Sequence, residues 1–445
     1  MLNRLFKLSD HGTTVSRELQ AGLTTFAAMA YILAVNPNIL ADTGMDRAAL
    51  VTVTALTAAV STMLMAALTN FPLALAPGMG INAFFTYTIC LGAGVRWQEA
   101  LGMVFVNGII FLMLSLTGVR EKIVRAIPYS LKIAITCGIG LFIAFIGLKN
   151  GGVIAASPAT FVTHGDFNSG PVAVCLMGIA ITIILVARRV PAAIILGILI
   201  TSLIGLFVSD GQGGKVTSLP GSWIDLPASP APVFLQLEFG FLQNWSAFQI
   251  ALPLILTLLL VDMFDNIGTL IGVTNRAGLL DADGNLPKAG NALVADSIAA
   301  ILSSLFGTST VVSYIESASG VEAGGRTGLT AVSVAVLMLL ALFLTPVILA
   351  IPAAATAPAL VVVGIFMLQS VTEIKMDDFK VAAPAMLTIL CIPLTFSIAE
   401  GIGLGLICAS LLALASGRPK DFPVVGYVIA AIFFLQFFRI FPFSG

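Results

Sequence analysis

Apolar segments long enough to cross a lipid bilayer recur along almost the whole sequence, and they constrain the fold more than any other feature. A helix of about 20 apolar residues spans a bilayer. Fourteen such runs lie near 17–41, 48–70, 72–92, 99–118, 128–148, 171–187, 191–208, 246–272, 290–306, 308–322, 328–350, 352–371, 379–397 and 400–416. Only 10% of the residues are charged, whereas a soluble domain carries about 25%. The sequence therefore predicts an all-α polytopic membrane protein with about fourteen spans.

A polar, proline-rich stretch divides the runs into two sets of seven. We expect an N-terminal segment, a first repeat, a linker on the extracytoplasmic side, a second repeat and a C-terminal segment, at 1–16, 17–208, 209–245, 246–416 and 417–445. A further apolar segment, 423–440, is compatible with a span, a surface helix or a helix packed on the bundle.

The two sets of runs resemble each other. Ile127-Pro128 opens the fifth run, and Ile351-Pro352 opens the twelfth. Seven is an odd number of spans, so the two halves must lie in opposite senses in the bilayer. The sequence thus predicts two inverted seven-span repeats.

The positive charges predict the orientation of the chain. If the N-terminus is cytoplasmic, sixteen of the 21 Lys and Arg residues fall on the cytoplasmic side. Only four fall on the opposite side, namely Arg47, Arg96, Lys149 and Lys215, and Arg439 stays unassigned. Short cytoplasmic loops of membrane proteins carry an excess of Lys and Arg. We therefore expect a cytoplasmic N-terminus.

The third and tenth runs are interrupted. Pro72, Pro77, Gly78 and Gly80 break the third, and the tenth carries Glu316 among serines and glycines. An acidic side chain at membrane depth costs about 3 kcal/mol or more on insertion scales. Interrupted segments at matching places in inverted halves mark the binding site of many transporters. The alternative for the tenth run is a cytoplasmic loop between two spans.

Other polar residues also fall at membrane depth. The eighth run carries Asp262, Asp265 and Asn266, the third carries Asn82 and the ninth carries Asp296. Spacings of three and four place Asp262 on the same helix face as Asp265 and Asn266. The alternatives are a solvated helix-end pair for the two aspartates, an interhelical hydrogen bond for Asn82 and a structural carboxylate for Asp296.

These groups restrict the substrate. Carboxylates and an amide converge, and no Arg or Lys lies in the middle of a run, so a substrate with N–H donors or a cation is favoured. A neutral heterocycle, a metal ion and an organic cation all remain possible. The five cysteines show no paired motif, and neither a metal-ligand nor a nucleophile pattern is present. We expect no cofactor, no structural metal, no enzymatic activity and, because the charges are few and dispersed, no nucleic-acid partner.

Four motifs resemble the AzgA-like purine permeases of the nucleobase–cation symporter-2 (nucleobase–ascorbate transporter) superfamily. They are N-P-x-I-L, A-P-G-M-G-I-N-A-F-F, V-D-M-F-D-N-I-G-T and G-T-S-T-V-V-S-Y-I-E-S-A-S-G-V-E-A-G-G-R-T-G-L-T, and the similarity runs from about Leu5 to Gly417. The resemblance implies short β-strands in spans 3 and 10. It also implies a core domain from 17–118 plus 246–350 and a gate domain from 128–208 plus 352–416.

The resemblance further implies proton-coupled uptake of adenine, guanine or hypoxanthine by alternating access, across the inner (cytoplasmic) membrane and often by a homodimer. It implies that Asp262 and Glu316 bind the purine, with Asn82 as a third polar group. Phe84, Phe264 and Tyr314 are the aromatic neighbours, one of which would stack on the base. The proton would be carried by Asp265, Asp296, Asp262 or Glu316. The alternatives are an anion transporter or exchanger of the same fold, a channel and, with least support, an intramembrane enzyme.

Overall fold

The computed structural model describes residues 2–117, 128–279, 286 and 288–437. Within this part, ten helical segments are long and apolar enough to cross a membrane. Seven of them are single helices: α4 (Arg47–Thr69), α6 (Trp97–Thr117), α8 (Tyr129–Asn150), α9 (Gly170–Ala187), α11 (Trp245–Arg276), α12 (Ala289–Phe306) and α18 (Ile398–Ala415). The other three are composite. Val15–Ala41 consists of α2 (Val15–Met29) and α3 (Ile32–Ala41), Gly328–Ala350 of α14 (Gly328–Ala341), η4 (Leu342–Leu344) and α15 (Thr345–Ala350), and Ala353–Glu373 of α16 (Ala353–Leu368) and η5 (Gln369–Glu373).

Shorter apolar helices correspond to the remaining runs. They are α5 (Met79–Ala83) continued by the π-helix η2 (Phe84–Gly92), α10 (Ala193–Gly205) and α17 (Phe379–Thr395). The further apolar segment after the fourteen runs forms the short helix α19 (Val424–Phe437). The very short α13 (Ser317–Glu322) completes the tenth run. The predicted fold class, a helical polytopic membrane protein with about fourteen segments, is confirmed.

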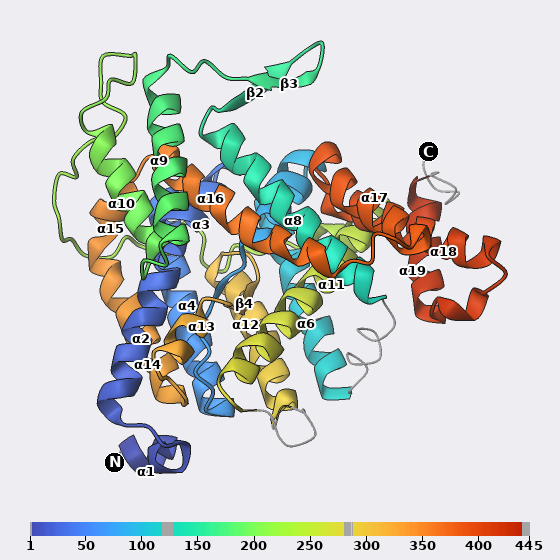
Figure 1. Ribbon diagram of the computed structural model, residues 1–445, viewed down its shortest axis with the longest axis horizontal. Helices are drawn as coiled ribbons and strands as arrows, with labels where there is room; N and C mark the ends of the chain where they lie inside the picture. The colour runs from blue at the N-terminus through green and yellow to red at the C-terminus, as the bar shows by residue number, and fades with distance from the viewer. Residues whose placement is uncertain (1, 118–127, 280–285, 287, 438–445) are drawn as a thin grey trace.

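The third and tenth spans are broken by short β-strands, as predicted. Strand β1 (Leu75–Pro77) pairs antiparallel with β4 (Val311–Ser313), with Leu75 opposite Ser313 and Pro77 opposite Val311. Proline and glycine interrupt the helices and leave backbone N–H and C=O groups without helical hydrogen bonds. Strand pairing supplies hydrogen bonds to these groups, which water cannot do inside a bilayer. The pair lies at the centre of the molecule, next to α12 and α13 (Figure 1).

The first span contains a break that the sequence analysis did not predict. Helix α2 ends at Met29, and α3 begins at Ile32 after Ala30 and Tyr31. Pro37 lies inside α3, and because proline lacks the N–H that would bond to the Leu33 carbonyl four residues earlier, it weakens the first turn of α3, next to this break. Tyr31 therefore lies at a bend instead of inside a straight helix.

Helices of the first half have counterparts in the second half, and when each helix is replaced by its counterpart the corresponding helix–helix contacts are found. Helix α4 packs against α14, and its counterpart α12 packs against α6. Likewise α2 contacts α14 while α11 contacts α6, and α9 contacts α16 while α17 contacts α8. This exchange is the pattern that two related halves in an inverted arrangement produce.

The helices pack as two groups. The first group contains α2 to α6 and α11 to α15, which surround the strand pair. The second group contains α8 to α10 and α16 to α18, with α8 packed along α16 and α17. Helix α19 packs on α18 at the edge of the molecule (Figure 1).

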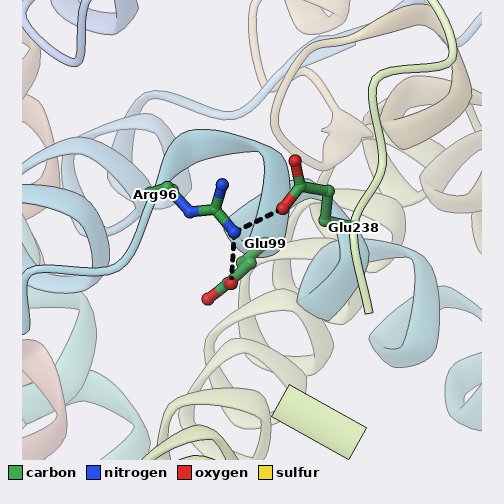
Figure 2. A network of polar contacts seen from close by, with 3 residues as sticks. All are labelled: Arg96, Glu99 and Glu238. Carbon is green, nitrogen blue, oxygen red and sulfur yellow. Dashed lines mark hydrogen bonds and ion pairs between the residues drawn. The ribbon is translucent and has the colours of Figure 1, made fainter. Parts of the chain in front are cut away.

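The segment between the halves is fixed to the first group. Arg96, just before α6, pairs with Glu99 on that helix at 2.8 Å and with Glu238 of the linker at 2.5 Å (Figure 2). Glu238 also donates its backbone N–H to the carbonyl of Gln98. Gly102 permits this approach, because a Cβ there would lie 2.1 Å from the Glu238 carbonyl oxygen. The linker therefore packs closely on the start of α6.

A hairpin of β2 (Ile154–Ser157) and β3 (Phe161–His164) extends from the end of the molecule opposite the N-terminus (Figure 1). The hairpin follows directly after α8 and is mostly exposed.

Candidate functional site

The strand pair holds the two broken spans together. Beyond the paired residues, the N–H of Gly78 donates to the Thr310 carbonyl at 3.1 Å, and the N–H of Tyr314 donates to the Ala74 carbonyl at 2.9 Å. The outer edge of β1 is paired by Thr62 of α4, whose hydroxyl exchanges hydrogen bonds with Leu75. Helices α5 and α13 begin immediately after their strands. The break is therefore a rigid unit from which side chains project at defined positions.

Glu316 lies at the start of α13 and is only partly buried. Its Oε1 accepts a hydrogen bond of 2.6 Å from the hydroxyl of Tyr31, at the bend of the first span. Its backbone carbonyl accepts a bond from the Ser319 hydroxyl. Because a carboxylate offers about four acceptor positions, Glu316 keeps capacity for a further N–H donor.

Asp262 on α11 is fully buried and is held by two amides. Asn266 donates to its Oδ1 at 2.9 Å, and Asn107 of α6 donates to its Oδ2 at 3.2 Å. Asn266 in turn accepts a 2.9 Å hydrogen bond from the N–H of Ser313 in β4. Asp262 is thus linked through Asn266 to the strand that precedes Glu316.

Asn82 on α5 is also fully buried. Its side-chain oxygen accepts a hydrogen bond from Ser309, which connects α5 to the approach to β4. Among the described residues its Nδ2 has no hydrogen-bond partner. A buried amide without a partner costs about 1–3 kcal/mol. Asn82 therefore presents a donor that a bound substrate or water would satisfy.

The aromatic candidates differ in what they contact. Phe84 begins η2 and is completely buried, and Tyr314 is buried with its hydroxyl donating to the Pro77 carbonyl at 2.6 Å. The Tyr314 hydroxyl thus ties β4 to β1. The side chain of Phe264 lies outside the described part of the structure, as does that of Asp265.

Asp296 lies on α12, one span away from this cluster, and is 2% exposed. Its neighbour Ser297 contacts Ser115 of α6, with 3.1 Å between the two hydroxyl oxygens. The structure therefore brings Asn82, Asp262, Tyr314 and Glu316 together around the strand pair and places Asp296 on the neighbouring helix α12.

Sequence reasoning missed several members of this site. Tyr31, Asn107 and Ser309 each bond to a predicted residue. Pro37, six residues after Tyr31, indicated a weakened helix in the first span but not the position of the bend. Nothing in the sequence indicated which distant amide would reach Asp262.

The arrangement combines carboxylate acceptors with an amide donor. A substrate N–H would match the Glu316 carboxylate, and a substrate acceptor would match the Asn82 amide. The partners of Glu316 and Asp262 described above are a phenol and two amides, all uncharged. These acceptors and the Asn82 donor together suit a planar molecule that both donates and accepts hydrogen bonds.

Comparisons with known proteins agree with this architecture. Residues 16–404 match the family model Xan_ur_permease, described as a permease family. A putative permease of Methanocaldococcus jannaschii, MJ0326, is 47% identical over 436 residues, covering 98% of each chain. The adenine permease AdeP of Escherichia coli is 41% identical over 437 residues, covering 98% of this chain and 96% of its own. The guanine/hypoxanthine permease PbuG of Bacillus subtilis is 41% identical over 445 residues, covering 98% and 99%.

A solved structure shares the fold. The transmembrane domain of the cyanobacterial bicarbonate transporter BicA superimposes with a TM-score of 0.67 at 17% identity, covering 86% of this chain and 96% of that domain. The prediction that the chain is a transporter and not an enzyme is confirmed by the family match and by the named relatives. The chain belongs to the permease family as a multi-pass membrane transporter, and its resemblance to the AzgA-like purine permeases is confirmed.

Proposed function

We propose that this permease carries a purine nucleobase, with a proton, across the cytoplasmic membrane by alternating access. The observation that carries the proposal is the Glu316 carboxylate, which lies at the break of the tenth span and is oriented by the Tyr31 hydroxyl. A purine N–H would donate to Glu316, and the Asn82 amide would donate to a ring nitrogen or exocyclic oxygen. The names of the relatives, adenine and guanine/hypoxanthine permeases, support a purine as the substrate.

Asp262 fits two roles in this proposal. It can accept a hydrogen bond from the purine directly, or it can hold Asn266 and thereby β4 in position. We propose Asp265 and Asp296 as further groups that affect proton coupling. Phe84, Phe264 and Tyr314 remain the proposed stacking partners of the base.

Alternating access requires two bodies that move relative to each other. We propose that the first helix group is the core domain, 17–118 plus 246–350, and that the second is the gate domain, 128–208 plus 352–416. The packing of α8 along α16 and α17, separate from the strand pair, supports this division. A cytoplasmic N-terminus and a homodimer complete the proposal. Three of the positive charges behind that orientation, Arg120, Lys122 and Arg125, lie outside the described residues.

Competition of labelled hypoxanthine uptake tests the substrate. Cells that lack their own purine permeases and express this chain should take up hypoxanthine, and excess adenine, guanine or both should reduce that uptake strongly. Uracil and bicarbonate should have little effect. Uptake of bicarbonate or sulfate without purine uptake would instead support an anion transporter of the same fold. Uptake that never exceeds the external concentration would support a channel.

A further inference from the structure

Tyr87 connects the two helix groups at the end of the molecule opposite the N-terminus. It lies on η2 of the first group and is 4% exposed. Its hydroxyl donates to Oδ2 of Asp42, just after α3, at 2.7 Å. The same hydroxyl accepts a 3.2 Å hydrogen bond from Asn150, the last residue of α8 in the second group. One phenol thus joins both groups.

Three further contacts join the groups at the same end. Asn38 of α3 donates to the Thr356 hydroxyl of α16 at 3.2 Å, and the Thr88 hydroxyl donates to the Phe396 carbonyl at 3.1 Å. The ammonium of Lys149 lies over the rings of Tyr87 and Phe396, at 5.3 and 5.9 Å from their centres. The Asn38–Thr356, Thr88–Phe396 and Lys149–Tyr87 contacts each pair a residue of one helix group with a residue of the other, so they must break if the groups separate here.

A cavity of about 360 Å³ lies among these contacts. Val35, Asn38, Asp42, Asn150 and Thr356 are among its lining residues. Arg47 borders it as well and donates to the Ile351 carbonyl at 3.0 Å. Four polar residues that take part in the contacts between the groups, Asn38, Asp42, Asn150 and Thr356, therefore also line this small vestibule.

A continuous helical segment connects this vestibule with the candidate site. Met79–Gly92 begins after β1, carries Asn82 and Phe84 beside the strand pair, and reaches Tyr87 and Thr88 one to two turns later. Its second part is π-helical, a conformation that is rare and often found at functional sites. A small shift of the strand pair would therefore move Tyr87 directly.

We propose that these hydrogen bonds between the helix groups form a gate, which closes the vestibule on the side of the β2–β3 hairpin. The gate consists of Tyr87, Asn38 and Thr88 and of their partners Asp42, Asn150, Thr356 and the Phe396 carbonyl. Opening this gate gives the substrate access to the site from that side, and η2 couples its state to occupancy of the site. The inference rests on the proposed alternating-access function, but its test does not depend on any substrate.

Cysteine labelling measures whether the gate is held shut. In a background with the five natural cysteines replaced, Val35→Cys places a thiol in the vestibule wall, at a position that is fully buried. Phe161→Cys, at a position that is 87% exposed on β3, defines the side of the membrane to which a membrane-impermeant maleimide is added. Adding Tyr87→Phe should raise the labelling rate of Val35→Cys roughly fivefold or more, as expected for the loss of hydrogen bonds that hold a closed state.

Tyr129→Phe is the matched control. It removes a tyrosine hydroxyl at the opposite end of α8, where Tyr129 bonds to Glu373 within the second group, and it should leave the labelling rate unchanged. Asn150→Ala is the second variant, because it removes only the bond between the groups. Phe161→Cys must label equally in all variants. Unchanged Val35→Cys labelling in both Tyr87→Phe and Asn150→Ala would overturn the proposal, whether or not the chain transports purines.

Discussion

At the residue scale, Glu316 is the side chain on which the proposed binding depends. Tyr31 occupies one of its oxygens at 2.6 Å, which fixes the carboxylate and leaves the remaining acceptor capacity for a substrate N–H. Glu316→Gln should lower purine affinity about tenfold to a hundredfold, since a hydrogen bond to a charged group contributes about 1.5–3 kcal/mol. Equilibrium binding of labelled purine to the purified variant measures this.

Two further variants make this prediction specific. Tyr31→Phe should weaken binding less than Glu316→Gln, because it releases the carboxylate without removing it. Glu322→Gln changes an exposed carboxylate on the same short helix and should bind like the wild type. Wild-type affinity in Glu316→Gln would remove Glu316 from the site.

Glu18 illustrates a buried carboxylate with a structural role. It lies fully buried on α2 and accepts hydrogen bonds from the backbone N–H groups of Arg326, Thr327 and Thr330 and from the hydroxyls of both threonines. These donors belong to the start of α14, where a negative charge also interacts favourably with the helix dipole. Glu18 therefore fixes the segment that follows α13 to the first span.

Glu18→Ala should reduce folding stability by about 3 kcal/mol or more, because it leaves several buried donors without a partner. Thermal unfolding in detergent should show a clear decrease in Tm relative to Glu322→Ala, which removes an exposed carboxylate. Equal Tm values for the two variants would contradict the role assigned to Glu18.

At the scale of elements, the sequence predicted those features that local composition determines. The apolar runs marked the spans, and Pro77, Gly78 and the serines near Glu316 marked the two breaks that became β1 and β4. The link from Asp262 through Asn266 to Ser313 could not be predicted. It depends on which segments, 47 residues apart in the chain, pack side by side, and neither periodicity nor spacing specifies that contact.

Movement of the two helix groups relative to each other can be tested by cross-linking residues that lie far apart in the sequence. A short bifunctional thiol reagent that joins Asn38→Cys to Thr356→Cys should stop transport while purine binding in detergent persists, because it fixes α3 to α16 across the proposed gate. Joining Ser115→Cys to Ser297→Cys is the control, since that pair lies within the first group at 3.1 Å between hydroxyl oxygens. Full transport by the protein cross-linked at Asn38 and Thr356 would show that this gate need not open.

At the scale of the whole molecule, the charge of the site decides which gradient can drive transport. Asp262 and Glu316 are carboxylates beside a substrate that we propose to be neutral, so each of them that stays ionised while the core moves places a negative charge at membrane depth. Such charge is costly at membrane depth. Binding of a proton to one of these carboxylates lowers that cost, and we therefore predict that a proton gradient, and not a sodium gradient, drives accumulation.

Proteoliposomes test this coupling directly. With one proton carried per purine, a pH gradient of one unit should support about tenfold accumulation of labelled purine, because one pH unit corresponds to about 1.4 kcal/mol per proton. A protonophore should abolish it. Asp210→Asn is the control. Backbone N–H groups of Gln212 and Gly214 hold the pKa of Asp210 below its ordinary value, so this carboxylate stays ionised during the assay. The variant should therefore accumulate purine like the wild type. Accumulation that follows a sodium gradient and persists with the protonophore would disprove proton coupling.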